Sequence, residues 1–177
     1  MYMDYRFENK PSYTTLVAEL DTGDTVKAES GSLVSYTQDI EVETERSGGG
    51  FLSSVKKSVL TDESVYVNNY TATSDGQEVK LAQYLPGDIT GIQLDNNSYY
   101  IQSGSYIANS LGIETDTSSG DLNSLFGGEG LFFLEASGQG TVFVGAYGGL
   151  IKKEIETDEV LTVDSGHAVA WSEDVNF

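Results

Sequence analysis

The stretch Ser119–Leu134, SGDLNSLFGGEGLFFL, guides the interpretation of the whole chain. It combines a short apolar turn of helix, a double-glycine corner, an acid and a hydrophobic strand. The same layout occurs earlier, from Gly48–Phe51 (GGGF) through to Val67. We therefore predict an internal repeat, with a short helix over Phe51–Leu60, where apolar residues fall at helical spacing.

Three further segments match one another and extend the repeat. Each is predicted to be a strand, a polar turn and a strand that lead to a Ser-Gly pair; they are Glu19–Gly31, Gln93–Gly104 and Glu154–Gly166. Such a match usually indicates stacked units that share one buried surface. We predict one repeat-built domain over residues 1–177, with repeats at about 1–86 and 87–149 and a partial third at about 150–177.

The composition is typical of an all-β chain. Runs of Tyr, Val, Thr and Ile are broken by Gly, Asn and Asp, and the 177 residues include 20 glycines and 2 prolines. Asp21–Asp24 and Asp75–Gly76 contain the residues of β-hairpin turns.

From the partial third repeat we predict a contact with another protein chain. Because it stops before a glycine corner and closing strands, we expect an unpaired sheet edge near the C-terminus. A homo-oligomer contact or a protein partner would cover that edge. Trp171 is then expected to be an interface residue.

The charge excludes several classes of partner. The chain has 28 acids and 9 bases, a formal net charge of −19. A field of this sign repels phosphate backbones and anionic membrane surfaces, so nucleic acid and direct membrane binding are disfavoured. Acids dispersed over the whole chain also suggest adaptation to concentrated salt; an ordinary acidic cytoplasmic protein is the alternative.

Other classes are excluded by missing residues and motifs. The chain has no cysteine, which rules out disulfides and thiolate metal sites. With one histidine and no spaced calcium loop we expect no defined metal site and no cofactor. The N-terminal residues lack the pattern of a signal peptide, and no apolar run is long enough to span a membrane, so we predict a cytoplasmic location.

Three residues are weak candidates for a site: Glu63, Glu129 and His167. Glu63 and Glu129 occupy equivalent positions in the repeats, and a pair of carboxylates could perform acid–base work of the glycosidase kind. We favour the interpretation that each accepts hydrogen bonds from the backbone of a corner. His167 follows a Ser-Gly turn, as Ser32 and Ser105 do, which favours a structural position over a catalytic one.

The glycines are predicted to form corners between strands. The Gly127–Gly130 segment (GGEG) lacks the Lys-Ser/Thr of a phosphate loop. Glycine supplies positive φ at such corners. The expected structural corners are Gly31, Gly104, Gly127, Gly128, Gly130 and Gly166.

Several motifs together resemble one known family. They are AESGSLV (28–34), LPGDI (85–89), QSGSY (102–106), SLFGGEGLF (124–132) and VDSGHAVA (163–170). In this order they resemble the prokaryotic members of the altered inheritance of mitochondria protein 24 family. The resemblance implies a TRAP-like β-sandwich of jelly-roll type, repeated within the chain, with short helices at glycine-rich corners. The mitochondrial members are associated with inner-membrane organisation.

No catalytic constellation accompanies these motifs. Our leading hypothesis is a non-enzymatic scaffold or binding protein that acts through oligomeric or partner assembly. The alternative is a carboxylate-dependent enzyme or small-ligand-binding protein on a cupin-like sandwich. RNA binding, by analogy with the TRAP-like fold, ranks third.

Overall fold

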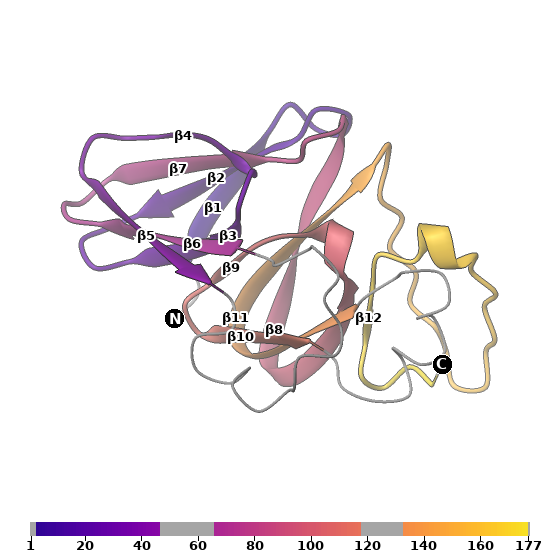
Figure 1. Ribbon diagram of the computed structural model, residues 1–177. Helices are drawn as coiled ribbons and strands as arrows, with labels where there is room; N and C mark the ends of the chain where they lie inside the picture. The colour runs from indigo at the N-terminus through magenta and orange to yellow at the C-terminus, as the bar shows by residue number, and fades with distance from the viewer. Residues whose placement is uncertain (1–2, 47–65, 118–132, 177) are drawn as a thin grey trace.

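A computed structural model describes residues 3–46, 66–117 and 133–176. These ranges form an all-β protein of two antiparallel sheets (Figure 1). The all-β prediction is confirmed, whereas the TRAP-like form of the repeats stays a prediction. The expected helix over Phe51–Leu60 and the glycine corner of Gly127–Gly130 lie outside the described residues.

The smaller sheet has the strand order β1-β2-β7-β4. Its strands are β1 (Asp4–Glu8), β2 (Thr15–Leu20), β7 (Gln77–Ala82) and β4 (Leu33–Tyr36). The larger sheet has the order β12-β8-β11-β9-β3-β6-β5, with β10 paired to β11. Its strands are β3 (Thr25–Glu29), β5 (Ile40–Arg46), β6 (Tyr66–Ala72), β8 (Gly87–Gln102), β9 (Tyr106–Ser110), β10 (Ile113–Thr117), β11 (Phe133–Tyr147) and β12 (Ala170–Ser172).

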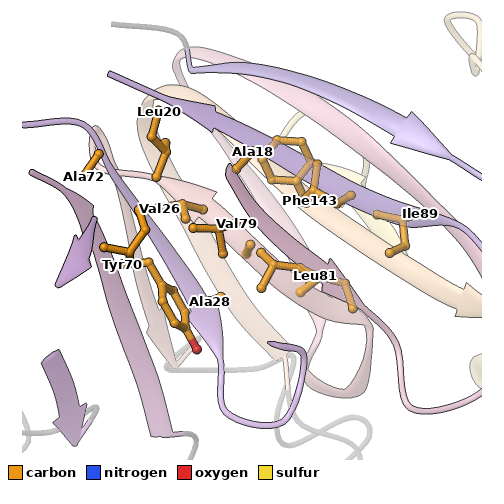
Figure 2. Packing of buried hydrophobic residues seen from close by; sticks show 14 residues of the cluster. Ala18, Leu20, Val26, Ala28, Tyr70, Ala72, Val79, Leu81, Ile89 and Phe143 are labelled. Carbon is orange, nitrogen blue, oxygen red and sulfur yellow. The ribbon is translucent and has the colours of Figure 1, made fainter. Parts of the chain in front are cut away.

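The first core lies between the two sheets. Alternate residues of β2 face it, namely Leu16, Ala18 and Leu20, as the period of two in a strand requires. They pack against Val79 and Leu81 of the same sheet and against side chains of the larger sheet (Figure 2). Those side chains are Val26, Ala28, Tyr70, Ala72, Ile89, Ile107, Ala108 and Phe143.

A second core is formed by the other half of the molecule. The long antiparallel strands β8 and β11 run through both halves (Figure 1), so that Ile89 and Phe143 belong to the first core while Leu94 and Val142 belong to the second. Phe143 and Phe133 are buried, as expected of strand aromatics. The second core consists of Leu94, Ile101, Tyr106, Ile113, Ala136, Val142 and Val144.

The two predicted hairpin turns are wrong as hairpins. Asp21–Asp24 joins β2 of the smaller sheet to β3 of the larger, and Asp75–Gly76 joins β6 to β7 across the same gap. The two turns contact each other, because the Asp75 carboxylate accepts a hydrogen bond at 3.0 Å from the Thr22 backbone N–H. Turn residues specify a chain reversal, but not which strands pair afterwards.

The second predicted strand–turn–strand is also wrong in form. Gln93–Gln102 lies within the continuous strand β8, and its polar turn is a β-bulge. Asn96 (φ 59°) is the extra residue of β8, since the neighbouring residues Gly138 and Gln139 of β11 pair with Asn97 and Asp95 and leave it without a partner in the ladder.

The third predicted pair of strands is absent from the described structure. Residues 149–164 are irregular apart from one turn at 157–158, and strand structure resumes only at β12. The segment forms the long excursion at the C-terminal side of Figure 1.

The three segments nevertheless share local geometry. A residue with positive φ stands seven positions before the serine of each Ser-Gly pair: Gly23 (89°), Asn96 (59°) and Asp158 (69°). The Asp24 backbone N–H donates to the Asp21 carbonyl at 2.8 Å, and the Glu159 N–H donates to the Glu156 carbonyl at 3.0 Å. Two of the Ser-Gly pairs form 3₁₀ turns, η1 (Ser103–Ser105) and η3 (Ser165–His167).

Candidate functional site

His167 lies on the surface. Its Nδ1 is 3.5 Å from the Asp164 Oδ1, and both side chains are exposed. Asp164 caps the turn η3, because the same Oδ1 accepts a hydrogen bond from the Gly166 backbone N–H at 3.1 Å. An exposed pair in high dielectric lacks the desolvation and fixed geometry that support a strong general base. The geometry therefore supports the structural interpretation of His167.

The remaining predicted site residues divide into two groups. Glu63, Glu129, Gly127, Gly128 and Gly130 lie outside the described residues. Gly31, Gly104 and Gly166 lie in turns, and Gly31 has φ 100°, a conformation that favours glycine.

The sequence reasoning missed an ionic cluster around a buried carboxylate at the LPGDI corner. Asp88 is buried, and its Oδ1 accepts hydrogen bonds from Thr14 Oγ1 at 2.7 Å and from the Ile89 backbone N–H at 2.9 Å. Lys10 Nζ lies 3.0 Å from the same oxygen, donates to the Ile89 carbonyl at 2.7 Å and sits 4.5 Å from the centre of the Phe7 ring. Burial by itself would raise the pKa of Asp88, but the hydrogen bonds from Thr14 and Lys10 outweigh it and lower that pKa.

The contacts of this cluster connect the two sheets. Lys10 lies in the turn between β1 and β2 and Thr14 directly precedes β2, whereas Asp88 is at the start of β8 in the other sheet. Gly87 is required beside it, because a Cβ there would stand 1.9 Å from the Ala146 carbonyl oxygen. The only sequence signal was the motif itself, since the side-chain partners of Asp88 are more than seventy positions away.

A second buried polar cluster stabilises the turn from β9 to β10. The Tyr106 hydroxyl donates to Asn109 Oδ1, and Asn109 Nδ2 donates to the carbonyls of Ser110 at 2.8 Å and Ile113 at 3.0 Å. Burial, with a smaller effect of the Glu29 charge, raises the pKa of Tyr106. Each contact is an internal hydrogen bond, so the cluster is interpreted as structural.

A shallow hollow of about 180 Å³ lies next to the LPGDI corner. It is lined by Tyr13, Thr14 and residues 82–87, and Tyr13 and Tyr84 are exposed. Ligand pockets usually enclose about 300–1,000 Å³. The hollow is therefore small for a substrate site.

Neither a metal centre nor a membrane helix is found in the described ranges. No group of three or more His, Asp or Glu side chains there is placed to hold a metal ion. No helix among these residues is long and apolar enough to cross a membrane.

Among the described residues, two segments each expose several large apolar side chains. The first is the irregular segment 149–164, whose aliphatic side chains stand in solvent: Ile151, Ile155, Val160, Leu161 and Val163. The second is β4, where Leu33, Val34 and Tyr36 are exposed at the edge of the smaller sheet. Trp171 belongs to neither surface, because its ring packs 5.1 Å from Phe133 and 6.1 Å from Tyr100 within the chain.

Comparisons with known proteins place the chain in a family. Residues 5–177 match the model of the family described as Mitochondrial biogenesis AIM24, and the chain belongs to that family. An uncharacterised protein of Streptococcus pyogenes serotype M6 is 25% identical over 99% of this chain and 73% of its own length. A Streptococcus pyogenes protein of known crystal structure has the same fold, with a TM-score of 0.75 and 23% identity over 97% of this chain and 77% of that one.

Proposed function

We propose that this AIM24 family member is a non-enzymatic scaffold or binding protein that acts through assembly with other protein chains. The observation that carries the proposal is the exposure of five aliphatic side chains on residues 149–164, a segment without a strand partner in the described structure. Burying such a side chain contributes about 1.5–3 kcal/mol, so a protein surface that covered the segment would gain several such contributions.

The polar clusters support the same proposal. The buried oxygens of Asp88 and Asn109 hold neighbouring strands and turns together, which explains them without a substrate. His167 is exposed and participates in a turn. These three side chains are thus accounted for by structure, whereas the apolar surface is not.

The test is sedimentation velocity together with native mass spectrometry. Because each copy carries a net charge of −19, like-charge repulsion opposes assembly at low ionic strength, so the protein is measured in about 1 M KCl and in dilute buffer. We expect multi-subunit species that are more populated at high salt. A monomer at every salt and protein concentration, carrying a stoichiometric bound small molecule, would support the alternative of an enzyme or ligand-binding protein.

A further inference from the structure

The chain already contains two internal junctions of one kind. Each Ser-Gly pair separates a leading segment from a following segment, and both are defined here by their distance from the glycine. The leading segments are Val26–Ala28, Tyr99–Ile101 and Leu161–Val163. The following segments are Ser35–Thr37, Ala108–Ser110 and Ala170–Ser172.

Each junction pairs a leading segment with the following segment of the next unit. At the first junction β3 pairs antiparallel with β9, and the partners are Val26 with Ser110, Lys27 with Asn109 and Ala28 with Ala108. At the second junction β8 pairs antiparallel with β12, and the partners are Tyr99 with Ser172, Tyr100 with Trp171 and Ile101 with Ala170. Counted from the glycines, the two registers are identical.

The strands β4 and β9 also have equivalent pairings on the side that faces away from the junction. Leu33 and Tyr36 of β4 pair with Leu81 and Val79 of β7, with a one-residue shift between Leu33 and Ser35. Tyr106 and Asn109 of β9 pair with Val144 and Val142 of β11, with the same shift at the same place. The strand β9 has a neighbour on each side, whereas β4 is the last strand of its sheet in the described structure.

One leading and one following segment therefore lack a junction. They are the leading segment Leu161–Val163 and the following segment Ser35–Thr37, which overlaps β4 and pairs only with β7 on its other side. We call these two the unpaired segments, because neither takes part in a junction. Burial shows the effect: Val34 is 59% exposed, whereas its equivalent Ile107 in β9 is 3% exposed. In the same way Leu161 and Val163 are exposed, whereas their equivalents Val26 and Ala28 are buried.

The two unpaired segments cannot meet within one copy as it is folded, because β4 and the excursion of residues 149–164 lie at opposite sides of the molecule (Figure 1). We propose that the leading segment of one copy pairs antiparallel with β4 of a second copy, in the register of the internal junctions: Leu161 with Thr37, Thr162 with Tyr36 and Val163 with Ser35. This inference rests on the proposed function and identifies the partner as a second copy of the chain.

The contact has a definite symmetry. Different surfaces of the two copies meet, so it is heterologous, and it generates a closed ring or an open filament according to the rotation between copies. Strand addition at an open edge supplies backbone hydrogen bonds, while the alternate side chains supply specificity. Here the junction would cover the exposed side chains of both segments.

Disulfide cross-linking tests the register. The chain has no cysteine, so each introduced thiol is unique. Directly opposed residues of antiparallel strands have Cα atoms about 4.5–5.5 Å apart, which is within disulfide range. We expect an equimolar mixture of the Ser35→Cys and Val163→Cys variants to form a disulfide-linked dimer under mild oxidation in about 1 M KCl. The double variant Ser35→Cys/Val163→Cys is expected to form a ladder of covalent oligomers.

A matched control uses Thr157→Cys, which is exposed in the turn of the same segment but outside the proposed pairing. Mixed with Ser35→Cys, it is expected to give at least tenfold less cross-linked dimer. Ser35 and Val163 are both exposed, so the substitutions leave the cores intact, and circular dichroism checks that the variants fold.

Four outcomes would overturn this pairing. Equal cross-linking by the Thr157→Cys control would show that the contact is nonspecific. A cross-link confined to the monomer of the double variant would show closure within one chain. Oligomers in sedimentation without the Ser35–Val163 cross-link would exclude this register and leave the proposed function standing. A monomer under all conditions, with no bound protein, would overturn both proposals.

Discussion

The β2–β3 segment and the excursion of residues 149–164 share a local design and differ in burial. Counted back from the Ser-Gly pair, Leu16 corresponds to Ile151 and Leu20 to Ile155. Both segments turn at a residue with positive φ, with the same hydrogen bond across the turn. Yet Leu16 and Leu20 are fully buried, whereas Ile151 is 95% exposed. The turn is a local property, whereas burial depends on neighbouring strands, which β2 has on both sides.

The largest expected difference between the segments is in the cost of truncation. Leu20→Ala leaves a cavity in the first core and is expected to lower the free energy of unfolding by about 2–5 kcal/mol. Ile151→Ala removes a side chain that is 95% exposed and contributes little to the fold of a single copy, so a change of less than about 0.5 kcal/mol is expected. Urea titrations at a protein concentration that keeps the chain monomeric measure both. Equal losses would show that the excursion belongs to the same cooperative core.

The next effect compares the buried carboxylate Asp88 with the exposed Asp164. Asp88→Asn is expected to destabilise by about 1–3 kcal/mol, because a charged acceptor of several hydrogen bonds is lost. Asp164→Asn serves as the matched control and is expected to change stability by less than about 0.5 kcal/mol.

The contribution of Asp88 to the free energy of unfolding is expected to decrease as the pH falls. Because the pKa of Asp88 is lower in the folded than in the unfolded chain, its contribution is complete above the unfolded value of about 3.9 and is lost as the pH falls through the folded pKa. The gap in stability between wild type and Asp88→Asn should therefore narrow below about pH 4. A gap that widened on acidification would contradict the assigned hydrogen bonds.

A smaller difference in stability is expected between substitutions in the two equivalent turns, at Gly23 and at Asp158. Gly23→Ala places a Cβ at φ 89°, where no atom lies within 4 Å of it, so the cost is conformational and about 1–2 kcal/mol. Asp158→Gly relaxes the equivalent turn in the excursion and should leave the thermal midpoint unchanged, because that turn is not packed into either core. A thermal midpoint altered equally by both changes would contradict the contrast between the two segments.

The smallest effect is expected at His167. His167→Ala removes an exposed side chain whose partner Asp164 retains its bond to the Gly166 N–H, so the unfolding free energy should change by less than about 0.5 kcal/mol. Equilibrium unfolding in urea at pH 7 checks this. A loss of about 1 kcal/mol or more would show that the imidazole holds η3 through Asp164.

Much of the local structure could be predicted. The strands observed at Thr15–Leu20, Thr25–Glu29 and Ile40–Arg46 lie in segments that the sequence shows as runs of β-type residues between turn signals. The Ser-Gly turns and the family were recognised from short motifs, because such motifs record backbone conformations within a few residues. The hairpins at Asp21–Asp24 and Asp75–Gly76 were wrong because pairing partners are decided by distant strands.

The candidate site was less predictable. Asp88 contacts Lys10 and Thr14, which lie more than seventy positions earlier in the chain, and no local pattern records that contact. The exposure of β4 could not be predicted from the sequence either, since Leu33 and Val34 have the same apolar character as Tyr106 and Ile107 of the buried strand β9. Their exposure differs only because β3 lies beside β9 and no described strand lies beyond β4.

By itself the sequence determined the all-β class, the positions of most strands, the turns and the family, because backbone preference and alternation of apolar residues act over a few positions. Only the tertiary structure decided which sheet each strand joins, where Asp88 finds its partners and which apolar segments are left without neighbours. These properties depend on contacts between residues that are far apart in the chain, and such contacts form only when the two sheets come together.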